Sequence, residues 1–94
     1  MTFDEFQYSI QTCKPPENST VYLKAMWYDG QGNWDAAHKL VDSLSDPTAC
    51  WVHAYLHRKE GDKWNADYWY RKAGKKMPAI TLQQEWENIV QSLL

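Results

Sequence analysis

Two histidines, His53 and His57, stand four residues apart in the stretch WVHAYLHR at positions 51–58. An α-helix brings residues i and i+4 onto one face, so both imidazoles would project from the same side of a helix. Two imidazoles at this spacing could bind a transition metal, or one could pair with a carboxylate in acid–base catalysis. The alternative is that both rings pack in the interior and form hydrogen bonds there.

A metal site would need a further ligand from elsewhere in the chain. His38 and Asp67 are the best candidates, because a 29-residue internal repeat places them at equivalent positions on two different helices. The stretch lacks the glutamate of the zinc-protease helix, and the two cysteines, Cys13 and Cys50, have no metal-binding or redox spacing. We therefore expect packing and predict no catalytic residue, metal ligand set or cofactor, with a small-molecule or metal site as the alternative.

The composition describes one globular domain with many aromatic residues. Hydrophobic residues make up 44% of the 94-residue chain, which contains six tryptophans and six tyrosines. The net charge of −2 provides no general attraction to nucleic acid or to an anionic membrane. The start, MTFDEFQYSI, lacks the pattern of a signal peptide, and no apolar run is long enough to span a membrane. Together with the two unpaired cysteines, these features predict a cytoplasmic protein.

Capping residues, glycines and prolines divide the chain into six predicted helices and no strand. Thr2 with Glu5 and Thr81 with Gln84 form capping-box patterns at the first and last helices. The predicted helices cover about residues 3–13, 19–29, 33–44, 46–60, 62–76 and 81–94. Because the connections are short, neighbouring helices should be antiparallel. The fold class is therefore all-α, a single domain over residues 1–94 built from helical hairpins.

An internal repeat relates the middle four helices. Small residues and a turn glycine recur with identical spacings in the two sets Ala25, Gly32, Ala37, Val41 and Ala54, Gly61, Ala66, Tyr70. The second unit, residues 47–78, resembles a tetratricopeptide repeat, and its segment NADYWYRKAG is similar to the related Sel-type repeat. Residues 18–46 resemble a degenerate copy. The resemblance implies a tetratricopeptide-like array, in which residues 1–13 and 81–94 would form capping helices because such units are stable only when stacked.

The resemblance also bears on the histidines and on function. His57 stands where a tetratricopeptide repeat commonly has an aromatic residue or histidine, whereas His53 occupies a position that is usually apolar. The segments WYDGQGNWDAAH, WVHAYLHRKEGD and NADYWYRKAG together resemble a family of small, mainly bacterial helical proteins with no established activity. That resemblance therefore supports the predicted fold and gives no prediction of function.

Stacked helical hairpins form a concave face that binds peptide segments, so the favoured function is a non-enzymatic protein–protein interaction module. Trp69 should pack against the last helix. Trp64 and Tyr68 should form a separate stripe, for which packing is favoured and an exposed binding surface is the alternative. The expected partner is a protein or peptide, or a second copy of the chain. Nucleic acid is disfavoured by the low charge, and no membrane partner is expected. The predicted contact residues are Tyr22, Met26, Tyr55, Arg58, Trp64, Tyr68 and Arg71.

Overall fold

The computed structural model describes all 94 residues and contains six helices and no strand, which confirms the all-α prediction. No helix is both long and apolar enough to cross a lipid bilayer. The helices are α1 (Phe3–Ser9), α2 (Val21–Gly30), α3 (Trp34–Val41), α4 (Pro47–Lys59), α5 (Lys63–Lys72) and α6 (Leu82–Leu93).

The predicted helix boundaries rest on capping interactions that the structure contains. The side chains of Thr2 and Thr81 accept hydrogen bonds from the backbone three residues on, and Glu5 and Gln84 complete both capping boxes. Every other helix also begins after a residue whose side-chain oxygen caps it, namely Thr20, Asn33, Asp46 and Asp62.

Three predicted helices are shorter than expected at their C-terminal ends, and the third of the six ends at Val41 instead of residue 44. The first ends at Ser9, where the hydroxyl groups of Ser9 and Thr12 bond to nearby backbone carbonyls and compete with the helical ladder. The fifth ends at Lys72, because Gly74 adopts a positive φ of 74° and turns the chain away. Residues 73–81 are therefore an irregular segment rather than a continuation of the helix.

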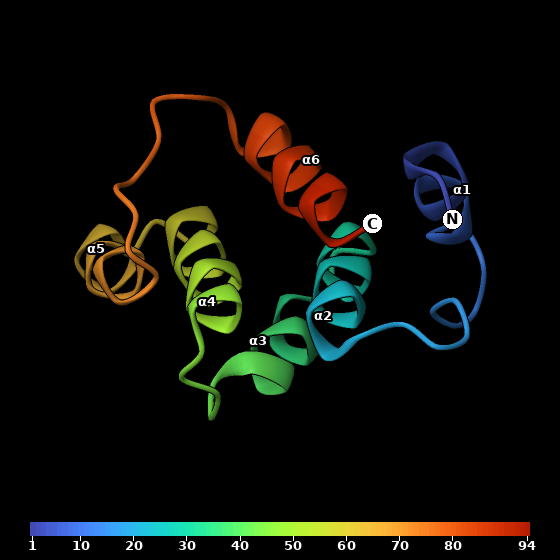
Figure 1. Ribbon diagram of the computed structural model, residues 1–94, viewed down its shortest axis with the longest axis horizontal. Helices are drawn as coiled ribbons and strands as arrows, with labels where there is room; N and C mark the ends of the chain where they lie inside the picture. The colour runs from blue at the N-terminus through green and yellow to red at the C-terminus, as the bar shows by residue number, and fades with distance from the viewer.

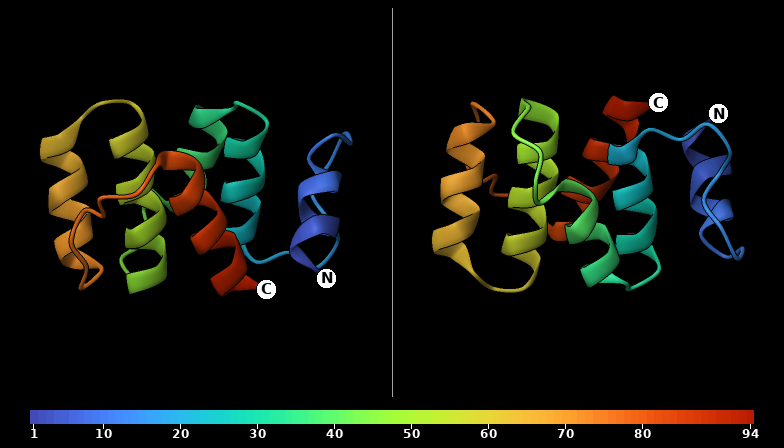
Figure 2. Two further views of the ribbon diagram at one scale, coloured as in Figure 1. Left: turned by 90° about the horizontal axis from the view of Figure 1, so that it is seen from above. Right: turned by 90° about the horizontal axis from the view of Figure 1, so that it is seen from below.

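The four middle helices form two antiparallel hairpins, α2 with α3 and α4 with α5, which meet where α3 contacts α4 (Figures 1 and 2). Gly32 and Gly61 reverse the chain within the hairpins with φ of 81° and 87°, a conformation that glycine adopts without strain. The repeat alanines, which include Ala25, Ala54 and Ala66, are fully buried and allow close helix crossings.

Helix α6 lies across α2 and α4 and covers the face that these two helices share (Figure 1). Trp86 of α6 is buried, and its indole N–H donates to the backbone carbonyl of Met26 at 3.2 Å. Phe3 and Phe6 of α1 pack against the same indole, with ring centroids 5.9 and 6.0 Å away. The chain's own last helix and α1 thus occupy the side on which a concave binding groove would otherwise form.

A buried carboxylate, Glu85, joins α6 to both α4 and α5. It accepts hydrogen bonds from the Tyr70 hydroxyl at 2.7 Å and from the Trp51 indole at 3.1 Å. Arg58 forms an ion pair with it at 2.8 Å and also donates to the backbone carbonyl of Ile80. Both members of the ion pair therefore form further hydrogen bonds, which offset part of the cost of their desolvation.

The substitution Glu85→Gln should lower the free energy of unfolding by about 3 kcal/mol, because it leaves the half-buried Arg58 guanidinium without a counter-charge. Urea denaturation measures this loss. Glu87→Gln on the same helix is the matched control, since Glu87 forms no ion pair, and it should change stability little. Equal losses in the two variants would contradict the assigned role of Glu85.

Candidate functional site

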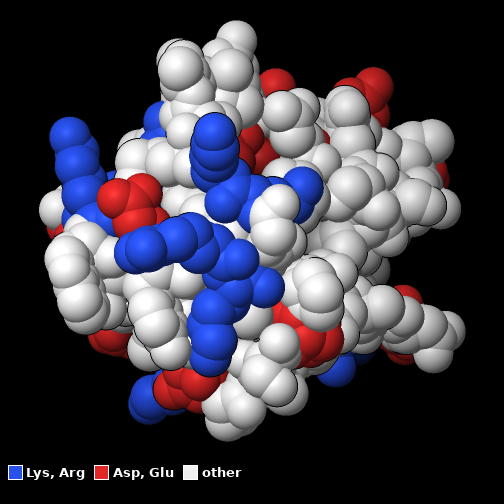
Figure 3. Space-filling model, turned by 60° about the vertical axis from the view of Figure 1, so that its left-hand side comes forward, with Lys and Arg blue, Asp and Glu red and all other residues white.

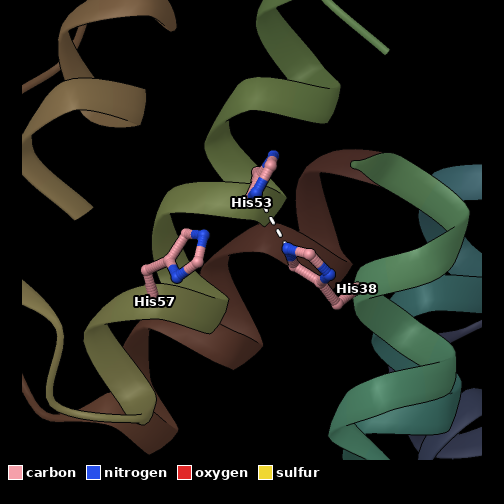
Figure 4. Close-up of side chains that lie close together, drawn as sticks. All are labelled: His38, His53 and His57. Carbon is pink, nitrogen blue, oxygen red and sulfur yellow. Dashed lines mark hydrogen bonds between the residues drawn. The ribbon is translucent and has the colours of Figure 1, made fainter. Parts of the chain in front are cut away.

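The structure gathers all three histidines of the chain at the contact between α3 and α4 (Figure 4). His53 and His57 project from one side of α4, and His38 reaches them from α3. Trp51 and Arg58 of α4 turn instead to Glu85 of α6. At 100° per residue, positions 51 and 53 point in nearly opposite directions. The histidines therefore lie on the face of α4 that α6 leaves uncovered.

The imidazole nitrogens are close enough to act together. The Nε2 atoms of His38 and His53 are 3.1 Å apart, and one ring nitrogen from each of the three histidines lies within 4.8 Å of the other two. The rings of His53 and His57 stack with centroids 4.8 Å apart, and the ring of His38 meets His53 edge-on at 4.7 Å. In the absence of a metal, the 3.1 Å contact can hold one proton between the two nitrogens.

Two tryptophans hold the rings of the cluster in place. Trp34 stacks on His38 with centroids 4.8 Å apart, and its indole N–H donates to the backbone carbonyl of Leu56 at 2.7 Å. Trp69 stacks on His53 at 4.0 Å. The prediction that Trp69 packs against the last helix was wrong, because α5 packs on α4 and brings this ring over His53.

Carboxylates orient the outer nitrogens of two histidines. The Nδ1 atom of His57 lies 2.7 Å from Oε1 of Glu60, and an ionised carboxylate only accepts hydrogen bonds, so the proton of a neutral His57 sits on Nδ1. Its Nε2 lone pair is then free for a ligand. Nδ1 of His38 has Asp42 as a weaker neighbour at 3.9 Å. A metal-ligating histidine usually has such a carboxylate behind it. The His57–Glu60 and Trp34–His38 pairs lie three and four residues apart, so helical spacing could have indicated them, whereas the stacking of Trp69 on His53 joins two helices and has no such signal.

His53 is the most buried of the three, at 3% exposed. Its burial, and to a lesser degree the charges of His38 and His57, lower the pKa of the imidazole from 6.5 to about 4. The ring is therefore neutral at pH 7 and keeps a lone pair for a metal. The Nδ1 atom of His53 is buried and has no hydrogen-bond partner. On that side of the ring, stacking against Trp69 replaces the hydrogen bond that would otherwise orient it.

The other predicted site residues do not join the histidines. Asp67 is exposed on α5 and lies outside the cluster. Met26 and Tyr55, which were predicted to contact a partner, are buried in the core, Tyr22 is half-buried against it, and Arg58 is bound to Glu85. Burial of Met26 and Tyr55 therefore contradicts their predicted contact with a partner, and the contacts predicted for Tyr22 and Arg58 stay predictions. The remaining predicted contacts, Trp64, Tyr68 and Arg71, are exposed on α5.

Comparisons with known proteins give no independent assignment of this site. No protein-family model, no curated protein and no solved structure matches the chain. The resemblance to tetratricopeptide and Sel-type repeats therefore stays a prediction from the sequence.

The low pKa of His53 predicts that the metal-free protein loses stability as the pH falls from 6.5 to 4. In this window the unfolded chain binds a proton at His53 that the folded chain excludes, so folding is favoured more at the higher pH, by up to about 3 kcal/mol. Urea denaturation across the window measures the loss, and His53→Phe should remove most of it. An NMR titration midpoint for His53 near 6.5 would contradict the assignment.

Proposed function

We propose that this protein binds a divalent transition metal through His38, His53 and His57. The observation that carries the proposal is the 3.1 Å separation of two imidazole nitrogens from different helices, with a third imidazole beside them. Two neutral imidazoles that direct lone pairs at each other repel unless a proton or a metal lies between them. A third donor beside the pair favours the metal, because a proton bridges only two nitrogens.

The distance between His38 and His53 fits tetrahedral coordination. Zinc–nitrogen bonds of 2.0–2.1 Å place two ligand nitrogens about 3.3 Å apart, close to the 3.1 Å between His38 and His53. The third nitrogen lies within 4.8 Å, so His57 needs to approach by at most about 1.5 Å. This movement requires the His57 side chain to rotate, and the Glu60 carboxylate must follow it if their 2.7 Å contact is to persist.

The donor set selects the kind of metal. Three imidazoles and no thiolate suit Zn²⁺, Ni²⁺, Co²⁺ and Cu²⁺, whereas Mg²⁺ and Ca²⁺ prefer oxygen ligands. Affinity for such nitrogen sites rises along the divalent series to Cu²⁺ and then falls at Zn²⁺. The metal that the protein holds in a cell therefore depends on availability as well as on affinity.

A bound metal would link the two helical hairpins. His38 belongs to the first hairpin and the other two ligands belong to the second, so three coordinate bonds would join α3 to α4. The side chains of His38 and His57 are 25% and 12% exposed, which leaves a fourth coordination position accessible to water or to an external ligand. We therefore expect metal binding to stabilise the fold.

Added Zn²⁺, Ni²⁺ or Cu²⁺ should raise the melting temperature of the metal-free protein. At a free metal concentration one hundred times the dissociation constant, binding only the folded state adds about 2.7 kcal/mol. For a chain of this size the melting temperature should rise by roughly 10 °C or more. Differential scanning calorimetry measures the shift, and Mg²⁺ should produce none.

Isothermal titration with Zn²⁺ on four variants tests the ligands one by one. His38→Gln, His53→Gln and His57→Gln should each weaken binding by at least about tenfold, since each removes a ligand. Asp67→Asn is the matched control and should bind as the natural chain does, because Asp67 lies outside the cluster. Unchanged affinity in all three histidine variants would exclude this site.

Protein interaction is a second candidate function, and Trp64 supports it. Its side chain is 76% exposed, which is unusual for tryptophan, and Tyr68 is 42% exposed one turn further along α5. Arg71 continues the same stripe, and its side chain forms no ion pair. Exposed aromatic and arginine side chains are typical anchors of a protein interface.

Self-association is the form of this hypothesis that the purified protein tests directly. Trp64 on α5 should bury its indole against a second copy, so the natural chain should sediment as a dimer at micromolar concentration and Trp64→Ala as a monomer. Lys63→Ala, at the neighbouring exposed position, is the control and should remain dimeric. A monomeric natural chain would contradict self-association.

A further inference from the structure

Positively charged side chains gather on the side of the molecule formed by α5 and the segment that follows it (Figure 3). Three of these residues, Arg71, Lys75 and Lys76, line two adjoining depressions there. None of the three has an acidic partner within ion-pair distance, although the chain pairs Arg58 and Lys59 with buried carboxylates. This cationic groove is separate from the histidine cluster.

The two depressions have volumes of about 290 and 420 Å³ and share Tyr70, Lys75 and Lys76 in their walls. Half-buried Trp51 and Ile80 give the smaller one an apolar wall. The Lys75 ammonium lies 4.2 Å from the centre of the Trp51 ring, so a cation–π contact holds it at the rim of this wall. The Lys75 ammonium group therefore lies beside the apolar surface formed by Trp51 and Ile80.

Two carboxylates also line the groove, and neither cancels its charge. Glu85 lies in the wall of the smaller depression, but it is buried and neutralised by Arg58. Asp67 is exposed in the larger one, against three cations there. The groove therefore remains net positive, and an anion that approaches along its rim meets unpaired ammonium and guanidinium groups.

We propose that the cationic groove binds an organic carboxylate with an apolar or aromatic body. The apolar body packs against Trp51 and Ile80, and the carboxylate takes hydrogen bonds from Lys75 and Lys76 in place of water. A free small acid and the C-terminal carboxylate of a peptide present the same chemistry, and the volume of the smaller depression accommodates a single aromatic side chain with its carboxylate.

Two pairs of probes distinguish these sources by ¹H–¹⁵N NMR titration of the full chain. The first pair is 4-phenylbutyrate and its neutral amide, and the second is acetyl-Ala-Ala-Phe with a free or an amidated C-terminus. The acids should shift the Trp51 indole N–H signal and the backbone signals of residues 71–80 saturably. If the natural ligand is a small molecule, 4-phenylbutyrate should bind more tightly than the peptide acid. If it is the C-terminus of a peptide, acetyl-Ala-Ala-Phe should bind more tightly.

Removal of the positive charges of Lys75 and Lys76 tests whether these side chains bind the carboxylate. The double variant Lys75→Gln with Lys76→Gln should weaken binding of the better acid by about tenfold or more, since charge-assisted hydrogen bonds are lost. Lys63→Gln, at the opposite end of α5, should leave binding unchanged. The proposal fails if neither acid shifts these signals at millimolar concentration, if the amides bind as well as the acids, or if the double variant binds as the natural chain does.

Discussion

The covering of α2 and α4 by α6 determines which surfaces of this chain remain available. A chain of this length has few core residues, and two helical hairpins alone would expose their apolar inner face. Trp86 and the hydrogen-bonded carboxylate of Glu85 fasten α6 over that face. The fold is thereby stabilised, and the groove in which a helical repeat would bind a peptide is filled by the chain's own residues.

The histidine cluster lies on the opposite side of α4. There His53 and His57 meet His38 between two stacked tryptophans, where α3 of the first hairpin contacts α4 of the second. Burial keeps His53 neutral at physiological pH, which costs stability in acid but leaves a lone pair for a metal. The burial that lowers the pKa of His53 therefore also keeps this imidazole in the neutral form that a metal requires.

Local signals in the sequence predict the helices well, whereas long-range packing decides the site. Capping boxes at Thr2 and Thr81 and the repeat alanines depend on neighbours within one or two turns, and they were correctly read. The repeat offset named His38 and Asp67 together as further ligands, and only His38 lies beside His53 and His57. Two features depend on how α5 and α6 pack against the rest of the chain, which no residue spacing encodes. They are the burial of Met26 and Tyr55 and the stacking of Trp69 on His53.

An X-ray absorption spectrum of the zinc-loaded protein tests the proposed metal site most directly. Three imidazoles held between α3 and α4 predict about three nitrogen neighbours at 2.0–2.1 Å with the multiple-scattering pattern of imidazole, and no sulfur neighbour. The imidazole pattern should weaken by one ring when His38 is replaced by glutamine. A spectrum with only oxygen neighbours, or one that this replacement leaves unchanged, would contradict the account.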